Sequence, residues 1–352
     1  MEPLETATAT RDVRAVLKDF LFFILFIRYV LSPWRSESMD GGAPMTKNFA
    51  AVAAQHTELV SISDGIATVD IAPAAGGALA SYRWWQDGAV VDWLRPADPA
   101  AISSRDAGAM ACFPLVPYSN RIRGGRFEFA GRTIRLPTTA DDPHHEHGHG
   151  WRRPWVVVRH EAGTIVLRYR HAADSWPWSY EAEQEITLAD GRLCVTIKVR
   201  NLSDAPMPAG FGLHPYFPST PWAHVQAPVS GMWETDTEVL PVRHVLPPVG
   251  ADPSIGFDVS EVDFDTVFSG WARRARISWP EHGRRLDIEA EAPLDFLVLY
   301  TPPGEPFFCA EPVSNITDAF NRTGSRIDTG CIVLAPGLMR SASVRFTPSL
   351  AG

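Results

Sequence analysis

The sequence is poor in cysteine and in positive charge, and each shortage excludes a class of protein. Its 352 residues contain four cysteines and no CxxC pair, so a disulfide scaffold is not indicated and a reducing, cytoplasmic location is expected. The 32 basic and 41 acidic residues give a formal net charge of −9. This charge argues against a nucleic-acid partner, which needs a basic surface, and suits a neutral or cationic small ligand.

A hydrophobic run long enough to span a membrane is also lacking. The most apolar segment, Phe20 to Leu31, is interrupted by an arginine and is shorter than the roughly 20 residues that a spanning helix needs. It is also a poor secretory signal, because the charges before it are mixed and no small-residue cleavage site follows. We interpret residues 1–44 as an extension outside the fold, either a mis-assigned start ahead of Met39 or Met45 or a weak signal or anchor. Residues 45–352 are expected to form a single domain.

Helical patterns are nearly absent, whereas hairpin patterns are frequent. The 30 prolines argue against a helical bundle, and Ala97–Ala111 is the best short helix candidate. Short alternating or apolar runs flank six turns, at Asp64-Gly65, Asp87-Gly88, Gly131, Gly163, Asp190-Gly191 and Gly283. Asp-Gly favours type I′ hairpins, in which both central residues need a positive φ. The sequence therefore predicts an all-β protein, a large antiparallel sandwich without interleaved helices.

Two segments carry polar residues that a strand does not require. Asn120 and Arg121 follow a path fixed by two prolines, and their planar donors suit sugar hydroxyls, although a solvated turn explains them as well. In HHEHGHG, an extended backbone would turn His145, His147 and His149 to one side, where three imidazoles would suffice for zinc. The glycines make a straight strand doubtful and no fourth ligand is indicated. We therefore expect one catalytic or sugar-binding histidine and no metal.

Two further segments place a titratable side chain among apolar ones. His214 is followed by Pro215, which holds it in an extended backbone, and it suits either the core or stacking on a sugar. Glu311 stands between an apolar run and Pro312. It is either an exposed residue that opens a loop or a general base. If buried, its carboxylate should be paired or have a raised pKa.

Together these segments resemble the aldose 1-epimerase family of the galactose mutarotase type. The resemblance covers about residues 55–348, in six motifs that follow the family's order. They are the PAAGG segment from Pro73, the Asn120-Arg121-Ile stretch, His147-Gly with Arg-Pro-Trp after it, LHPYF around His214, Asp265-x-x-Phe and Glu311-Pro. The resemblance implies a β supersandwich and an isomerase that interconverts the α and β anomers of a free aldohexose, such as glucose or galactose.

The resemblance also implies roles for individual residues. Glu311 takes the proton from the anomeric hydroxyl, and His214 protonates the ring oxygen. The residues that bind the sugar are His147, Asp265, Arg121 and Asn120. Mutarotation requires no cofactor and no metal, because a base at O1 and an acid at the ring oxygen suffice.

Several alternatives stay open at this point. If the match to the family's histidine motif is shifted by two residues, His145 or His149 takes the place of His147. Asp263 likewise competes with Asp265 for the position of the sugar-binding aspartate. A hexose-6-phosphate epimerase would use the arginines at 123, 126, 152 and 153 for the phosphate. A non-catalytic carbohydrate-binding protein would need no acid–base pair, and a separation of Glu311 and His214 beyond about 10 Å would favour it. The preferred aldose is open, and either a monomer or a homodimer is expected.

Overall fold

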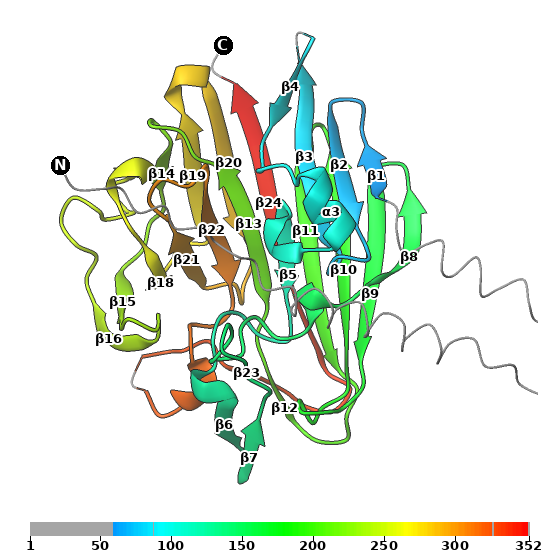
Figure 1. The fold of residues 1–352 in the computed structure, drawn as a ribbon, viewed down its shortest axis with the longest axis vertical. Helices are drawn as coiled ribbons and strands as arrows, with labels where there is room; N and C mark the ends of the chain where they lie inside the picture. The colour runs from blue at the N-terminus through cyan, green and yellow to red at the C-terminus, as the bar shows by residue number, and fades with distance from the viewer. Residues whose placement is uncertain (1–58, 87, 326, 351–352) are drawn as a thin grey trace, which may run out of the picture. The chain divides into compact units, whose positions relative to one another are not determined.

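The computed structural model describes residues 59–350, apart from residues 87 and 326, and almost all of its strands pair antiparallel (Figure 1). The predicted all-β class is confirmed. The α-helix of the described residues is short, α3 (Pro99–Ser104), and lies within the predicted stretch. No helix in this part of the chain has the length and hydropathy to cross a membrane. The interpretation of residues 1–44 as an extension lies outside the described residues.

Two large sheets account for most of the strands. The eleven-stranded sheet has the order β1 (Val60–Ser63), β2 (Ala67–Ala72), β3 (Ala78–Gln86), β5 (Cys112–Leu115), β13 (Gly212–Pro218), β22 (Phe307–Val313), β21 (Phe296–Tyr300), β18 (Asp265–Ser269), β15 (Gly231–Thr235) and β16 (Pro241–Val245), with β4 (Ala89–Asp92) beside β3. The nine-stranded sheet has the order β17 (Phe257–Asp258), β14 (His224–Gln226), β19 (Arg274–Trp279), β20 (Arg284–Ala290), β24 (Met339–Leu350), β11 (Arg192–Asn201), β10 (Tyr180–Ala189), β9 (Thr164–His171) and β8 (Val156–Glu161).

The remaining elements are two short strand pairs and several 3-10 turns. Two strand pairs stand apart, β6 (Arg126–Phe129) with β7 (Arg132–Arg135) and β12 (Met207–Ala209) with β23 (Ile332–Leu334). Short 3-10 turns occur at Ala107–Ala109, Arg123–Gly125, Gly150–Arg152, Val259–Glu261, Pro280–His282 and Ala319–Asn321.

All six predicted hairpins form, as the pairs β1–β2, β3–β4, β6–β7, β8–β9, β10–β11 and β19–β20. The expected turn geometry is found at Asp190-Gly191, where φ is 53° and 74°. At Asp64-Gly65 only the glycine has a positive φ. That loop is longer, and the Asp64 carboxylate instead accepts hydrogen bonds from the backbone N–H groups of Ile66 and Ala67.

The two large sheets face each other across the main hydrophobic core, to which both contribute. β10 and β11 alternate between buried and half-buried residues, as expected for strands with one face in the core. The β10–β11 turn also ties the sheets together. The Tyr82 hydroxyl and the Trp84 indole N–H, both on β3, donate hydrogen bonds to the Gly191 carbonyl oxygen.

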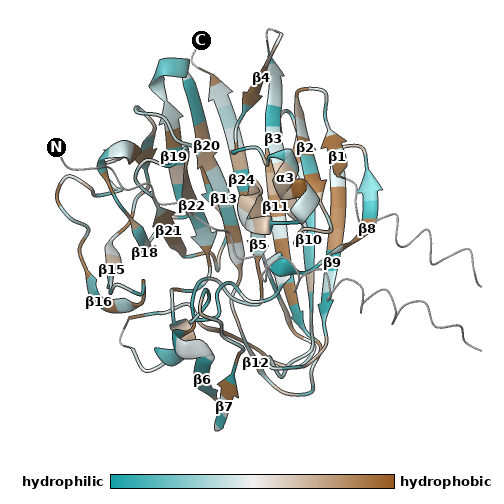
Figure 2. Ribbon diagram, viewed as in Figure 1, coloured by the Kyte–Doolittle hydropathy of each residue, from teal (hydrophilic) through white to brown (hydrophobic). Residues whose placement is uncertain are grey.

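The central strands of the eleven-stranded sheet are buried on both faces. β5 is buried throughout, as are nearly all of β13 and β22, and β21 is mostly brown, that is hydrophobic, in Figure 2. On the outer face, Ala107 and Met110 of the loop before β5 share a second apolar cluster with Phe113 and Val298 of the strands. Loops thus cover this face. A polar side chain that is buried on this face needs a partner or a ligand.

The loop between β7 and β8, which contains the histidine segment, is fixed to the end of β5. Val116 and Gly148 form an isolated parallel bridge, and the N–H groups of His149 and Gly150 both donate hydrogen bonds to the Val116 carbonyl oxygen. Gly148 has a φ of 68°, and a Cβ there would lie 2.6 Å from that oxygen. This approach therefore requires glycine.

Replacing Gly148 by alanine is expected to lower the free energy of unfolding more than replacing Gly131. Their φ angles are 68° and 74°, so each alanine carries a similar backbone strain of about 1–2 kcal/mol. A Cβ at Gly131 meets nothing within 4 Å, whereas the one at Gly148 clashes with backbone, which adds roughly 1–3 kcal/mol. Denaturant unfolding of both variants measures the difference, and equal losses would contradict the close contact at Gly148.

Candidate active site

Neighbouring strands of the eleven-stranded sheet place titratable side chains on one face. The register pairs Gly212 with Val313 and Tyr216 with Cys309, which puts His214 of β13 opposite Glu311 of β22. Residues directly opposite on antiparallel strands share a face and come into contact. The pairs His214–Phe113, Glu311–Val298 and Tyr300–Asp265 extend this row from β5 to β18.

This row forms one wall of a pocket of about 230 Å³, and loops form the other. The lining consists of Gly108, Phe113, Asn120, Arg121, Glu146, His147, Trp151, His214, Tyr216, Asp265, Val298, Tyr300 and Glu311. All six residues to which the sequence assigned a role are included. The volume is below the roughly 300–1,000 Å³ of sites for drug-sized ligands, so the pocket has room for one small ligand.

Glu311 and His214 form a buried pair in this wall. The His214 Nε2 atom lies 3.3 Å from the Glu311 Oε1 atom, and the two residues are only 7% and 2% exposed. The His214 ring stacks against both Phe113 and Tyr216, with ring centroids 4.5 and 4.7 Å away. The other polar atoms of the pair, His214 Nδ1 and Glu311 Oε2, have no hydrogen-bond partner among the described residues. Packing thus holds the pair in place, while one polar atom of each partner lacks a hydrogen bond.

Burial favours the neutral forms of both groups. It raises the pKa of Glu311 well above its usual value, and the nearby carboxylates of Asp265 and Glu146 raise that pKa further. It also lowers the pKa of His214 well below its usual value, with a further contribution from His147. A single proton shared by the pair therefore prefers the carboxyl group, which gives a neutral pair rather than an ion pair.

His147 is oriented by the Asn120 backbone. The Asn120 N–H donates a hydrogen bond of 3.0 Å to His147 Nδ1, and the His147 N–H donates one of 3.0 Å to the Asn120 carbonyl oxygen. Because Nδ1 accepts, we assign the proton of the neutral imidazole to Nε2, which faces Glu146 at 3.5 Å. Burial, with the positive charges of Arg121 and Arg152, lowers the pKa of His147 to about 3. This ring is therefore a neutral N–H donor.

Arg121 lies between two carboxylates. Its guanidinium nitrogens are 3.2 Å from Glu146 Oε1 and 3.8 Å from Asp265 Oδ2. Burial raises the pKa of both Glu146 and Asp265, while Arg121 lowers each of these pKa values. The arginine thus helps to keep both carboxyl groups ionised as hydrogen-bond acceptors.

The loop that follows β22 holds the Asn120-Arg121 segment in place. The Asn315 side chain donates a hydrogen bond to the Ser119 carbonyl oxygen and accepts one from the Ser119 N–H, at 3.1 and 3.2 Å. The Asp318 N–H donates one of 2.8 Å to the Arg121 carbonyl oxygen. The strand that carries Glu311 therefore continues into the supports of the opposite wall.

The alternative residues considered for the histidine and aspartate positions lie outside the pocket lining. His145 and His147 have positive φ angles of 47° and 58°, so the segment is not an extended strand and its histidines do not face one side. The ring of His145 bonds to the Tyr118 hydroxyl and that of His149 lies near the Tyr180 hydroxyl, and neither histidine lines the pocket. Asp263 is likewise exposed and outside it.

Sequence reasoning missed several lining residues. Glu146 was passed over inside the histidine segment, although a carboxylate next to His147 was a usable signal. Tyr216 and Phe113 were also missed. Tyr216 lies two residues after His214, a spacing that places both side chains on one face of a strand, so it could have been found. Phe113 becomes apparent only through the pairing of β5 with β13.

Comparisons with known proteins give a family match and a related protein. A family model described as aldose 1-epimerase matches residues 58–347. The uncharacterized protein YphB of Escherichia coli K12 is 32% identical over 288 residues, which are 79% of this chain and 94% of YphB.

Two solved structures have a similar fold. A protein from Escherichia coli K12, provisionally assigned as an aldose 1-epimerase, superposes with a TM-score of 0.75 at 29% identity, covering 83% of this chain and 99% of its own. A galactose mutarotase-like protein from Clostridium acetobutylicum also has a TM-score of 0.75, at 20% identity and with 83% and 95% covered. The predicted supersandwich is confirmed.

His147→Asn is expected to change how stability depends on pH. With the pKa of His147 lowered to about 3, the unfolded chain binds a proton that the folded chain does not between about pH 3 and pH 6.5. In this window the residue's contribution makes stability rise with pH, by up to about 1.4 kcal/mol per unit. Asparagine tolerates the positive φ, and its Oδ1 can accept the Asn120 N–H.

Urea unfolding of the wild type and the variant at about pH 7 and about pH 4.5 measures this dependence. The stability advantage of the wild type should shrink on acidification. An advantage that stays constant would contradict a buried neutral imidazole.

Proposed function

The chain belongs to the aldose 1-epimerase family, and on this premise we propose that it interconverts the α and β anomers of a free aldose. The observation that carries the proposal is the buried Glu311–His214 pair, 3.3 Å apart in the wall of a pocket for one small ligand. Hydrogen-bond reach to a single sugar ring requires such closeness, and a separation beyond about 10 Å would have favoured a binding protein instead.

The proposed reaction uses the pair as base and acid. Opening of the hemiacetal requires removal of the proton of the anomeric hydroxyl and addition of a proton to the ring oxygen. We assign the first step to Glu311 and the second to His214, each typically contributing 10²–10⁴-fold to the rate. Rotation about the C1–C2 bond then exposes the other face of C1. Reclosure reverses both transfers, so no proton is consumed.

The surroundings of the pair favour the ring-opened stage. Opening converts an ionised Glu311 and a protonated His214 into their neutral forms. Burial raises the pKa of Glu311 and lowers that of His214, so it stabilises these neutral forms. Starting from the resting neutral pair, the proton must first move from Glu311 to His214, and ring opening then returns both groups to their favoured neutral forms.

The remaining lining suits a neutral sugar. Asn120, Arg121, His147 and Asp265 offer both donors and acceptors to hydroxyl groups. Trp151 stacks on Phe113 with ring centroids 5.1 Å apart and lines the pocket as an apolar surface for a sugar ring.

A phosphorylated sugar fits the lining less well. Among the described residues that line the pocket, Arg121 is the one arginine or lysine, and it already lies beside Glu146 and Asp265. The arginines at 123, 126, 152 and 153 do not line it. A phosphate would therefore meet carboxyl groups without a free cation, which disfavours hexose 6-phosphates. A cytoplasmic location and a monomeric or dimeric state stay predictions.

Glu311→Gln is expected to lower kcat at least 10²-fold, because the amide keeps the shape of the side chain but cannot accept the anomeric proton. His214→Asn should have a similar effect through loss of the acid. Since the two residues act as one unit, the double variant should be little slower than the slower single variant. Polarimetry or saturation-transfer NMR of anomer exchange measures these rates.

Asp265→Asn provides the matched control. It also replaces a carboxylate of the pocket by an amide, yet its effect should fall mainly on KM, because this residue holds the sugar in the ground and transition states alike. A near wild-type kcat for Glu311→Gln would mean that another carboxylate is the base.

Free aldohexoses should be better substrates than hexose 6-phosphates. The reason is the acidic lining, together with the net charge of −9, which disfavours anions at long range. A panel of glucose, galactose, xylose, arabinose and glucose 6-phosphate, compared by kcat/KM, measures this preference. A value highest for glucose 6-phosphate would reverse the proposed substrate class.

A further inference from the structure

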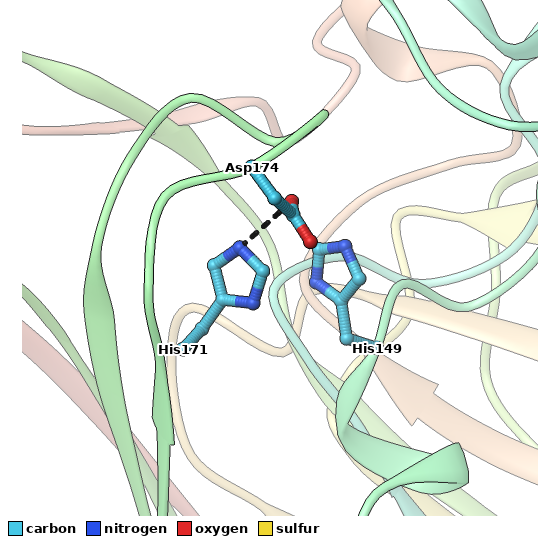
Figure 3. A group of neighbouring side chains, drawn as sticks. All are labelled: His149, His171 and Asp174. Atoms are coloured by element: carbon cyan, nitrogen blue, oxygen red, sulfur yellow. Dashed lines mark ion pairs between the residues drawn. The ribbon is translucent and has the colours of Figure 1, made fainter. Parts of the chain in front are cut away.

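A second group of titratable side chains lies outside the pocket, where the histidine segment meets the β9–β10 loop. It consists of His149, His171 and Asp174, and one potential ligand atom from each residue lies within 4.8 Å of the others (Figure 3). His171 Nε2 is 3.2 Å from Asp174 Oδ1. His149 Nε2 is buried and has no hydrogen-bond partner among the described residues. None of the three residues lines the pocket.

Each imidazole of this group has a tyrosine hydroxyl near its other ring nitrogen. His149 Nδ1 is 3.3 Å from the Tyr180 hydroxyl, and His171 Nδ1 is 3.4 Å from the Tyr169 hydroxyl. A metal-binding histidine commonly donates its second N–H to such an outer partner, which fixes the tautomer and leaves the first nitrogen free for the metal. His171 Nε2 also lies 3.4 Å from the Trp176 carbonyl oxygen, which is a long contact.

We propose that His149, His171 and Asp174 bind a first-row divalent transition metal, with Zn²⁺ as the representative ion. Two imidazoles and one carboxylate are a donor set that suits zinc or iron, whereas Mg²⁺ and Ca²⁺ prefer oxygen ligands throughout. This differs from the expectation that the histidine segment binds no metal, because His171 and Asp174 come from another part of the chain.

Binding requires the two rings to reorient. At metal–ligand distances of about 2.0–2.2 Å, the ligand atoms of a tetrahedral site lie about 3.4 Å apart, close to the present His171–Asp174 separation. The rings of His149 and His171 now stack with centroids 4.3 Å apart and 10° between their planes. Because an imidazole binds a metal in its own plane, the ion would open this stack. Bound there, it would link the β9–β10 loop to the segment that carries His147.

The test is a calorimetric titration of the full chain, free of any affinity tag and stripped with a chelator, with ZnCl₂ and separately with MgCl₂. About one Zn²⁺ per chain should bind, with a rise in Tm because the ion binds the folded form. His171→Ala and Asp174→Asn should each weaken Zn²⁺ binding at least about 10-fold. The Asp174 side chain is 54% exposed, so its variant keeps the result interpretable if His171→Ala fails to fold.

His282→Ala is the matched control. His282 is exposed and also lies next to a carboxylate, 3.7 Å from Glu281, so its loss should leave Zn²⁺ affinity unchanged. A different group in the pocket, His214, Cys309 and Glu311, also has its ligand atoms within 4.8 Å of one another. Zinc that still binds to Asp174→Asn with wild-type affinity and inhibits anomer exchange would place the ion there and overturn the proposal. Absence of Zn²⁺ binding to the wild type would also overturn it.

Discussion

Burial of the Glu311 carboxyl group on β22 costs free energy, and this cost constrains how the rest of the site is arranged. The group is 2% exposed, and among the described residues its ion-pair contact is with a histidine that burial also keeps neutral, not with an arginine or lysine. An ordinary buried carboxylate is paired with an arginine or with several backbone N–H groups. Here Arg121 interacts instead with Glu146 and Asp265. The Glu311–His214 pair can therefore change its protonation state without breaking a salt bridge.

This arrangement depends on a sheet that is covered on both faces. The inner face packs against the nine-stranded sheet, and loops and a second apolar cluster cover the outer one. Antiparallel sheets often leave one face in water, where the pair would be hydrated and its pKa values would be ordinary. The covered outer face is thus what shifts the pKa values of Glu311 and His214 toward their neutral forms.

Local features of the fold could be predicted from the residues themselves, whereas the assembly of distant residues into the pocket could be predicted only through the family resemblance. The six hairpins follow from turn residues between alternating runs, since each depends on a few neighbouring residues. β22 reads FFCAEPV and is almost fully buried, so no alternation reveals which face Glu311 takes. The contact of Asn120 with His147 depends on a positive φ angle in each of two separate loops, which no periodicity encodes. The assembly of His149 with His171 and Asp174 likewise depends on how β9 packs against a distant loop.

Because β22 continues directly into the loop after it, the number of residues between Glu311 and that loop fixes part of the geometry of the site. Glu311 sits on the strand, while Asn315 and Asp318, a few residues further on, hold the backbone of the Asn120-Arg121 wall. The same short stretch of chain thus sets both the position of Glu311 and the position of the pocket wall beside it. Side chains here can be exchanged one at a time, but an inserted or deleted residue would shift the two walls against each other. In this part of the protein, the number of residues is more tightly constrained than the identity of each side chain.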